Sequence, residues 1–239
     1  MSRAVIQCGW DDVPHLRQED IESMIKGLPP HEIEARRKGI PSLGSGAIYP
    51  IPEEDILCEP FSIPPHFAKA YGMDVGWKMT TAIWGAYDRD NDIIYAYSEH
   101  GRGQAEPIIH ATAIKARGAW INGIIDTAAR GRSQVDGKNL FDLYEEQGLI
   151  LNNADKAVEA GLLEVYQRFS TGRLKLFNTL QGTRSEYRIY RRDDKGRVVK
   201  ENDHYMDALR YLVMGIEHAT TEPIKQQSFS RVGDSYAGY

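Results

Sequence analysis

Hydrophobic and polar positions change their spacing along the chain in a way that predicts strands followed by helices. Three segments rich in β-branched, aromatic and small apolar residues follow one another with short polar turns between them, which predicts two successive hairpins. Two further apolar segments of strand length then alternate with stretches of helical periodicity. The expected strands are 70–76, 80–87, 93–98, 121–126 and 149–151, and the expected helices are 104–117, 139–147 and 156–169. The order β-β-β-α-β-α-β-α predicts an α/β fold, a mixed sheet with helices on its faces.

The ends of the chain do not follow this pattern. Proline and glycine are dense between residues 39 and 65, which keeps a backbone extended or turning. The last residues are polar, which is typical of a flexible end. The expected divisions are an N-terminal arm or linker at 1–66, a domain at 67–219 and a flexible tail at 220–239.

A basic hairpin and a final helix are predicted late in the chain. Tyr187–Arg192 and Arg197–Lys200 read as two strands around a polar turn at 193–196. The stretch 202–211 then opens a helix whose apolar positions recur at i, i+3, i+4 and i+7. These positions are Leu209, Leu212, Val213 and Ile216.

Composition places the chain among ordinary globular proteins. Of its 239 residues 26% are charged and 41% hydrophobic, values that allow a sizeable core. No run approaches the roughly 18 apolar residues of a membrane span. The two cysteines, Cys8 and Cys58, give neither a disulfide framework nor a metal-ligand spacing. The net charge of −5 argues against a protein that binds nucleic acid non-specifically over its whole surface. Residues 184–200 nevertheless hold seven basic and three acidic side chains, a local net charge of +4.

Aspartates stand at the points where this fold would place a site. Asp74 ends the first strand, Asp126 ends the fourth, and Asp203 opens the last helix with Asp207 one turn later on the same face. In such sheets, sites form at the carboxyl ends of strands. Hard oxygen ligands suit Mg²⁺ or Mn²⁺, and three aspartates can hold two ions about 4 Å apart that hydrolyse a phosphodiester. The alternatives are that Asp74 is a turn residue and that Asn202 or Asp203 caps the helix. Asp126, inside an apolar run, favours a functional role because a buried carboxylate needs a partner.

Three stretches carry a resemblance to a known family. They are YGMDVGW at 71–77, IIDTAA at 124–129 and KENDHYMDALRY at 200–211. With this element order, the chain resembles the ribonuclease H-like C-terminal nuclease domain of the large terminase subunit of tailed bacteriophages. The segment 28–50 is similar to the one that precedes that nuclease, so the resemblance covers nearly the whole chain.

The resemblance implies a two-metal endonuclease that uses Mg²⁺ or Mn²⁺ to cut concatemeric viral double-stranded DNA during packaging. By position, Asp74, Asp126 and Asp203 would be the metal ligands. The implied setting is the host cytoplasm, away from any membrane, with a packaging ATPase, a small terminase subunit and a portal as partners. The chain lacks the G-x-x-x-x-G-K-[ST] phosphate loop, so we expect the motor domain to be absent from it.

Two residues near the third ligand need separate interpretation. Many relatives carry a second acid directly after that ligand, whereas this chain has His204. His204 is therefore a proton shuttle, a phosphate contact or an ordinary first-turn histidine. Asp207 either supports the ligands or pairs with a basic side chain such as Arg210.

Basic residues directly before Asp203 and the last helix form a candidate DNA-binding strip. We expect them to follow the DNA backbone without reading its sequence. They are Arg184, Arg188, Arg191, Arg192, Lys195, Arg197 and Lys200. The loop 130–133 is either a further phosphate contact or a plain surface loop. Other readings of the whole chain are a non-catalytic DNA-binding or portal-docking module, and a ribonuclease H-like resolvase or transposase.

Overall fold

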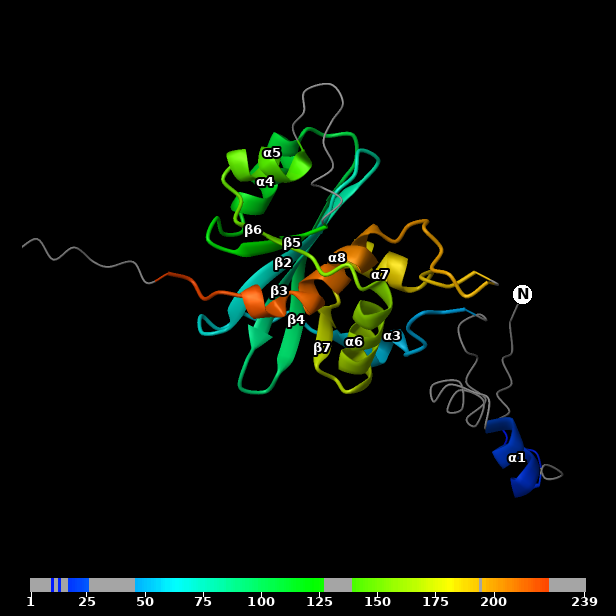
Figure 1. Cartoon of the computed structure of the whole chain (residues 1–239). Helices are drawn as coiled ribbons and strands as arrows, with labels where there is room; N and C mark the ends of the chain where they lie inside the picture. Colours follow the sequence, from blue (N-terminus) through cyan, green and yellow to red (C-terminus); the bar gives the residue numbers. More distant parts are fainter. Residues whose placement is uncertain are drawn as a thin grey trace, which may run out of the picture.

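A seven-stranded mixed sheet organises the protein in the computed structural model (Figure 1). The structure describes residues 10, 13, 17–25, 46–126, 139–193 and 195–223. The strands are β1 (Leu57–Cys58), β2 (Ala68–Asp74), β3 (Thr80–Asp88), β4 (Ile93–Arg102), β5 (Asn122–Ile125), β6 (Leu151–Asn153) and β7 (Leu174–Phe177). Their order across the sheet is β1-β7-β4-β3-β2-β5-β6. The antiparallel pairs β2–β3 and β3–β4 form the centre, and the other pairs are parallel. The predicted mixed α/β sheet is confirmed.

Helices cover both faces of this sheet. The described helices are α1 (Gln18–Ile25), which lies apart from the sheet in Figure 1, α3 (Glu53–Ile56), α4 (Pro107–Lys115), α5 (Leu140–Glu146), α6 (Val158–Ser170), α7 (Gln181–Tyr187), α8 (His204–Met214) and the 3₁₀ turn Ile216–His218. One core joins α6 and α8 to the sheet, and a second joins α4 and α5 to its other side. Ile83 belongs to the first core and Trp84 to the second, as expected of neighbours on a strand. None of the described helices is both long and apolar enough to cross a membrane.

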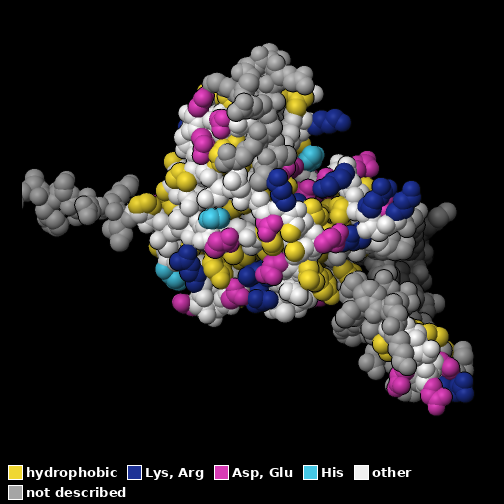
Figure 2. Space-filling model, viewed as in Figure 1, with side chains coloured by type: hydrophobic (Ala, Val, Ile, Leu, Met, Phe, Trp, Pro, Cys, Tyr) yellow, Lys and Arg dark blue, Asp and Glu magenta, His cyan; other side chains and the backbone are white. Residues whose placement is uncertain are grey.

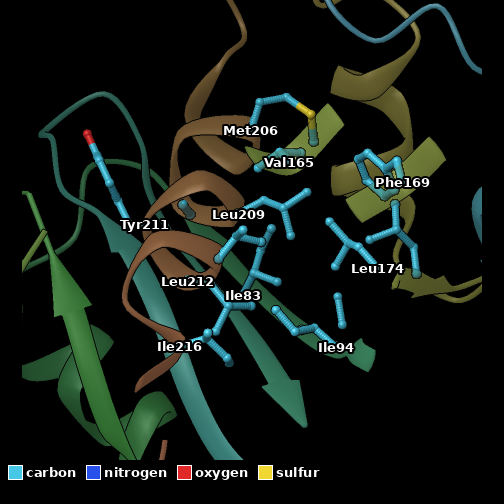
Figure 3. Packing of buried hydrophobic residues seen from close by; sticks show 14 of the residues in the cluster. Ile83, Ile94, Val165, Phe169, Leu174, Met206, Leu209, Tyr211, Leu212 and Ile216 are labelled. Carbon is cyan, nitrogen blue, oxygen red and sulfur yellow. The ribbon is translucent and has the colours of Figure 1, made fainter. Parts of the chain in front are cut away.

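Helix α8 is the element that fixes the site. Leu209 and Leu212 are fully buried and point toward Ile83 and Ile94 of the sheet (Figure 3). Burying each leucine stabilises this contact by about 1.5–3 kcal/mol. Gly72 of β2 allows the close approach, because a Cβ there would lie 2.0 Å from the carbonyl oxygen of Ala208. The start of α8 therefore has a defined position above β2.

Described residues before position 67 pack into the same sheet and hydrophobic core as the rest of the domain. Strand β1 pairs in parallel with β7, and Ile56 and Tyr49 are buried in the core shared with α8. Neither β1 nor β7 was predicted. The division of the chain at residue 67 stays a prediction, and the tail from 224 onward lies outside the described residues.

The predicted basic hairpin is wrong in its first half. Residues 181–187 form helix α7, and Tyr187 is its last residue. The pairing that remains is a single antiparallel bridge between Arg192 and Val198. The buried positions of α7 are Thr183, Glu186 and Tyr187, which follow helical spacing but are largely polar. Hydrophobic periodicity therefore does not predict this helix. The alternation of tyrosine with arginine after it is typical of a strand, which led to the incorrect prediction.

Candidate active site

Strand pairing brings Asp74 and Asp126 to adjacent positions. Strands β2 and β5 run in parallel with Met73 opposite Ile125, and each aspartate is the next residue of its chain. Burial raises the pKa of Asp74, and the negative charges of Asp207 and Asp126 add to that increase, against the lowering effect of His204. The pKa of Tyr211 rises by burial and also through the charges of Asp207, Asp126 and Asp74. These carboxylates thus share one region beside α8.

The carboxylate of Glu186, on α7, caps the first turn of α8 in place of the N-cap residue Asp203. Asn202 adopts a positive φ of 53°, and Asp203 follows at the N-cap position without a side-chain capping hydrogen bond. The Glu186 carboxylate accepts the backbone N–H of Tyr205 at 2.6 Å and of Met206 at 3.3 Å. Burial nevertheless raises the pKa of Glu186 to about 7. Because another acid satisfies the first-turn donors, the carboxylate of Asp203 is available for a different role.

Lys200 joins the two acids of α8. Its Nζ lies 3.0 Å from Oδ2 of Asp203 and 2.8 Å from Oδ2 of Asp207. The other oxygen of Asp207 accepts from Arg210 Nη2 at 2.9 Å, so the predicted pairing with Arg210 is present. Among the described residues, the buried Oδ2 of Asp203 has no hydrogen-bond partner, and its contact with Lys200 is an ion pair. Asp203 and Asp207 therefore face the same way, as their i, i+4 spacing requires.

His204 connects the helix to β2. Its Nδ1 lies 2.8 Å from Oδ2 of Asp74, and this contact raises the pKa of the imidazole. The backbone carbonyl of His204 accepts a hydrogen bond from the hydroxyl of Thr81 at 2.9 Å, which ties the helix start to β3. His204 is thus placed beside a predicted ligand, with its side chain 35% exposed.

The donor chemistry of this region suits a hard divalent cation, because three aspartates offer carboxylate oxygens and the buried carboxylate of Asp203 is paired with an exposed lysine. As the side chains stand, His204 contacts Asp74, Lys200 pairs with Asp203 and Asp207, and Arg210 pairs with Asp207. Within the described ranges, no three His, Cys, Asp or Glu side chains converge closely enough to hold an ion. Ligation by Asp203 would therefore need Lys200 to give up its present contact with that carboxylate.

Most cations of the predicted DNA-binding strip are occupied by carboxylates. Arg184 and Arg188 both pair with Glu53, at 2.6 Å each. The other pairs are Arg192 with Glu159, Arg197 with Asp193, and Lys200 with the α8 acids. In the part of the chain that the structure describes, Arg191 and Lys195 are exposed and have no ion pair. Figure 2 shows basic and acidic side chains interspersed over this segment. The loop 130–133 lies outside the described residues.

Two residues that shape the site carry no recognisable signal in the sequence. The capping role of Glu186 depends on helix α7, which the sequence pattern does not predict. Thr81 lies on a strand, where no spacing distinguishes it from its neighbours. Both act through the backbone of α8, a contact that sequence alone does not display.

Comparison with known proteins points to one family. Residues 71–215 match the terminase RNaseH-like domain. The chain is 34% identical over 225 residues to the large terminase subunit of Enterobacteria phage LP7, covering 88% of this chain and 46% of that protein. It thus spans about half the length of this curated relative.

Two solved structures show the same fold. The nuclease domain of the P22 large terminase aligns with a TM-score of 0.69 at 30% identity, over 75% of this chain and 96% of that one. The large terminase nuclease of thermophilic phage G20c with bound magnesium aligns with a TM-score of 0.54 at 15% identity, over 72% of this chain and 98% of that one.

Proposed function

The chain belongs to the terminase RNaseH-like domain family, and we propose that it is a metal-dependent endonuclease that cuts double-stranded viral DNA during packaging. The observation that carries this proposal is the pairing of β2 with β5, which sets Asp74 beside Asp126 under the acidic start of α8. The length of the LP7 relative leaves room for a further domain, and we propose an ATPase motor, a small terminase subunit and a portal as partners.

Asp74, Asp126 and Asp203 are the proposed ligands of Mg²⁺ or Mn²⁺, two ions in all. The magnesium bound to the G20c nuclease supports a divalent cation in this fold. When bound, such ions supply water activation and charge stabilisation at the scissile phosphate. The chain's own residues hold the acids in place: Arg210 fixes Asp207, and Glu186 fixes the first turn of α8.

His204 has a proposed role in proton transfer or phosphate contact. Its Nδ1 is oriented by Asp74, which leaves Nε2 as the second ring nitrogen for a substrate group. A carboxylate that orients an imidazole in this way also stabilises its protonated form. The placement of His204 at the start of α8 keeps it next to the proposed ligands.

Plasmid digestion tests this function. The wild-type chain is incubated with supercoiled plasmid and Mn²⁺ or Mg²⁺, beside Asp74→Asn, Asp126→Asn and Asp203→Asn. The exposed Asp90, in the turn at the other end of β3 and β4, provides the control Asp90→Asn. We expect cutting by the wild type and the control and none by the three variants. Equal cutting by all five proteins would reject the site, and DNA binding without wild-type cutting would favour a non-catalytic module.

A further inference from the structure

An exposed tryptophan stands three residues after Asp74. Trp77 has 65% of its surface exposed, more than any other large hydrophobic side chain among the described residues. A single exposed apolar residue is ordinary on a protein surface. The surroundings of Trp77 are what make it informative.

The loop that carries Trp77 is held at several points. The Trp77 carbonyl accepts the backbone N–H of Gln104 at 2.8 Å, and Thr80 Oγ1 donates to the Gly76 carbonyl at 3.0 Å. Gly103 permits a close approach, since a Cβ there would lie 2.2 Å from the Lys78 carbonyl oxygen. The indole is therefore presented to solvent from a defined backbone.

Strand register places this loop at the same edge of the sheet as the carboxylates. Asp74 is opposite Thr81, which is itself opposite Gly101, so the three residues form one row across β2, β3 and β4. Thr80 and Arg102 form the next row outward. The loop 75–79 and Arg102 thus lie just beyond Asp74 at this edge of the sheet.

Two uncommitted cations accompany the tryptophan. Lys78 and Arg102 are both exposed, and within the described residues neither forms an ion pair. The cations at 184, 188, 192 and 197, in contrast, are neutralised by carboxylates. Free cations next to an aromatic ring are a combination that binds the phosphates and the bases or sugars of nucleic acid.

We propose that Trp77, Lys78 and Arg102 form a DNA-contact rim beside the active site. Lys78 and Arg102 bind backbone phosphates of duplex DNA, and Trp77 packs against the sugar or an unstacked base of the strand nearest Asp74. Contacts of this kind position the duplex without reading its sequence. This inference rests on the proposed function, because it takes DNA as the substrate.

Binding of a fluorescent duplex to the whole chain tests the rim without requiring cleavage. Anisotropy is measured in EDTA at several salt concentrations between about 20 and 200 mM. One variant carries both Lys78→Gln and Arg102→Gln. Two further single variants are Trp77→Ala and Trp77→Phe. Arg89→Gln is the matched control, since Arg89 is an exposed arginine in the turn at the opposite end of β3 and β4.

We expect the double variant to bind about tenfold more weakly and to lower the slope of log affinity against log salt by about 2, near 0.9 per lost phosphate contact. Trp77→Ala should weaken binding, and Trp77→Phe should retain most of it.

The rim is overturned if the double variant behaves like Arg89→Gln or if the wild type shows no binding at the lowest salt. Trp77 is removed from the rim if Trp77→Ala binds normally, which would favour contact with another protein domain. If the wild type cuts plasmid and the rim variants bind DNA as the wild type does, the rim is rejected and the nuclease proposal stands. If the rim variants bind DNA more weakly but the wild type does not cut plasmid, the nuclease proposal is rejected and the rim stands.

Discussion

Lys200 extends its ammonium group to within 2.8 Å of Asp207 while its side chain stays 60% exposed. The same nitrogen is 3.0 Å from Asp203, so one exposed cation pairs with both acids at the start of α8. Arg210, by contrast, is only 3% exposed and holds Asp207 from inside the fold. The two cations therefore differ in kind: Arg210 is a fixed partner, and Lys200 is a partner that can leave.

Removing the Lys200 ammonium should strengthen metal binding. In Lys200→Met the acids of α8 lose a positive charge that competes with a divalent ion. Charges about 4 Å apart interact by about 1 kcal/mol in water and more near a protein surface, so Mn²⁺ affinity should rise roughly tenfold. Calorimetric titration with Mn²⁺, in the absence of DNA, measures the change. Lys195→Met removes an exposed charge without an ion pair and should bind as the wild type does. Identical affinities in all three proteins would show that Lys200 does not compete.

Asp207 and Asp203 should differ in their contribution to stability. Asp207→Asn leaves the buried guanidinium of Arg210 without its charged partner, and loss of such a partner typically costs about 3–5 kcal/mol. Asp203→Asn removes a carboxylate whose partner, Lys200, is already exposed, and it should cost less than about 1 kcal/mol. Urea denaturation of both variants gives the comparison. Equal losses would mean that Arg210 does not depend on Asp207.

The buried Glu186 should make stability depend on pH. Its pKa is raised from the ordinary 4.5 to about 7 in the folded protein, so the folded state retains a proton that the unfolded state has already lost. The free energy of unfolding should therefore fall as pH rises from about 4.5 to about 7, by up to about 3 kcal/mol from this group. Glu186→Gln keeps an acceptor for the α8 N–H groups and removes the titration. The difference in unfolding free energy between wild type and variant, measured at several pH values, should change across this range. A difference that is constant with pH would contradict the assignment.

The sequence could predict the ends of the strands better than the contacts between distant side chains. Asp74 and Asp126 were found because each closes an apolar segment, and their pairing follows from the order of the elements. The start of α8 was predicted correctly, but its capping by Glu186 was not, because α7 buries mostly polar residues. The local sequence of the basic strip indicates a surface that faces solvent. Arg184 and Arg188 nevertheless pair with Glu53, more than 130 positions away in the chain, and no local pattern reveals such a contact.

The position of bound manganese decides whether Asp74, Asp126 and Asp203 form a metal site. A crystal of the whole chain soaked in Mn²⁺ and measured near the manganese absorption edge would show each ion by its anomalous signal. We expect ions at the ends of β2 and β5, held by Asp74, Asp126 and Asp203, with Lys200 displaced from Asp203. Saturating Mn²⁺ with no signal between these aspartates, or with ions held only by other residues, would contradict it.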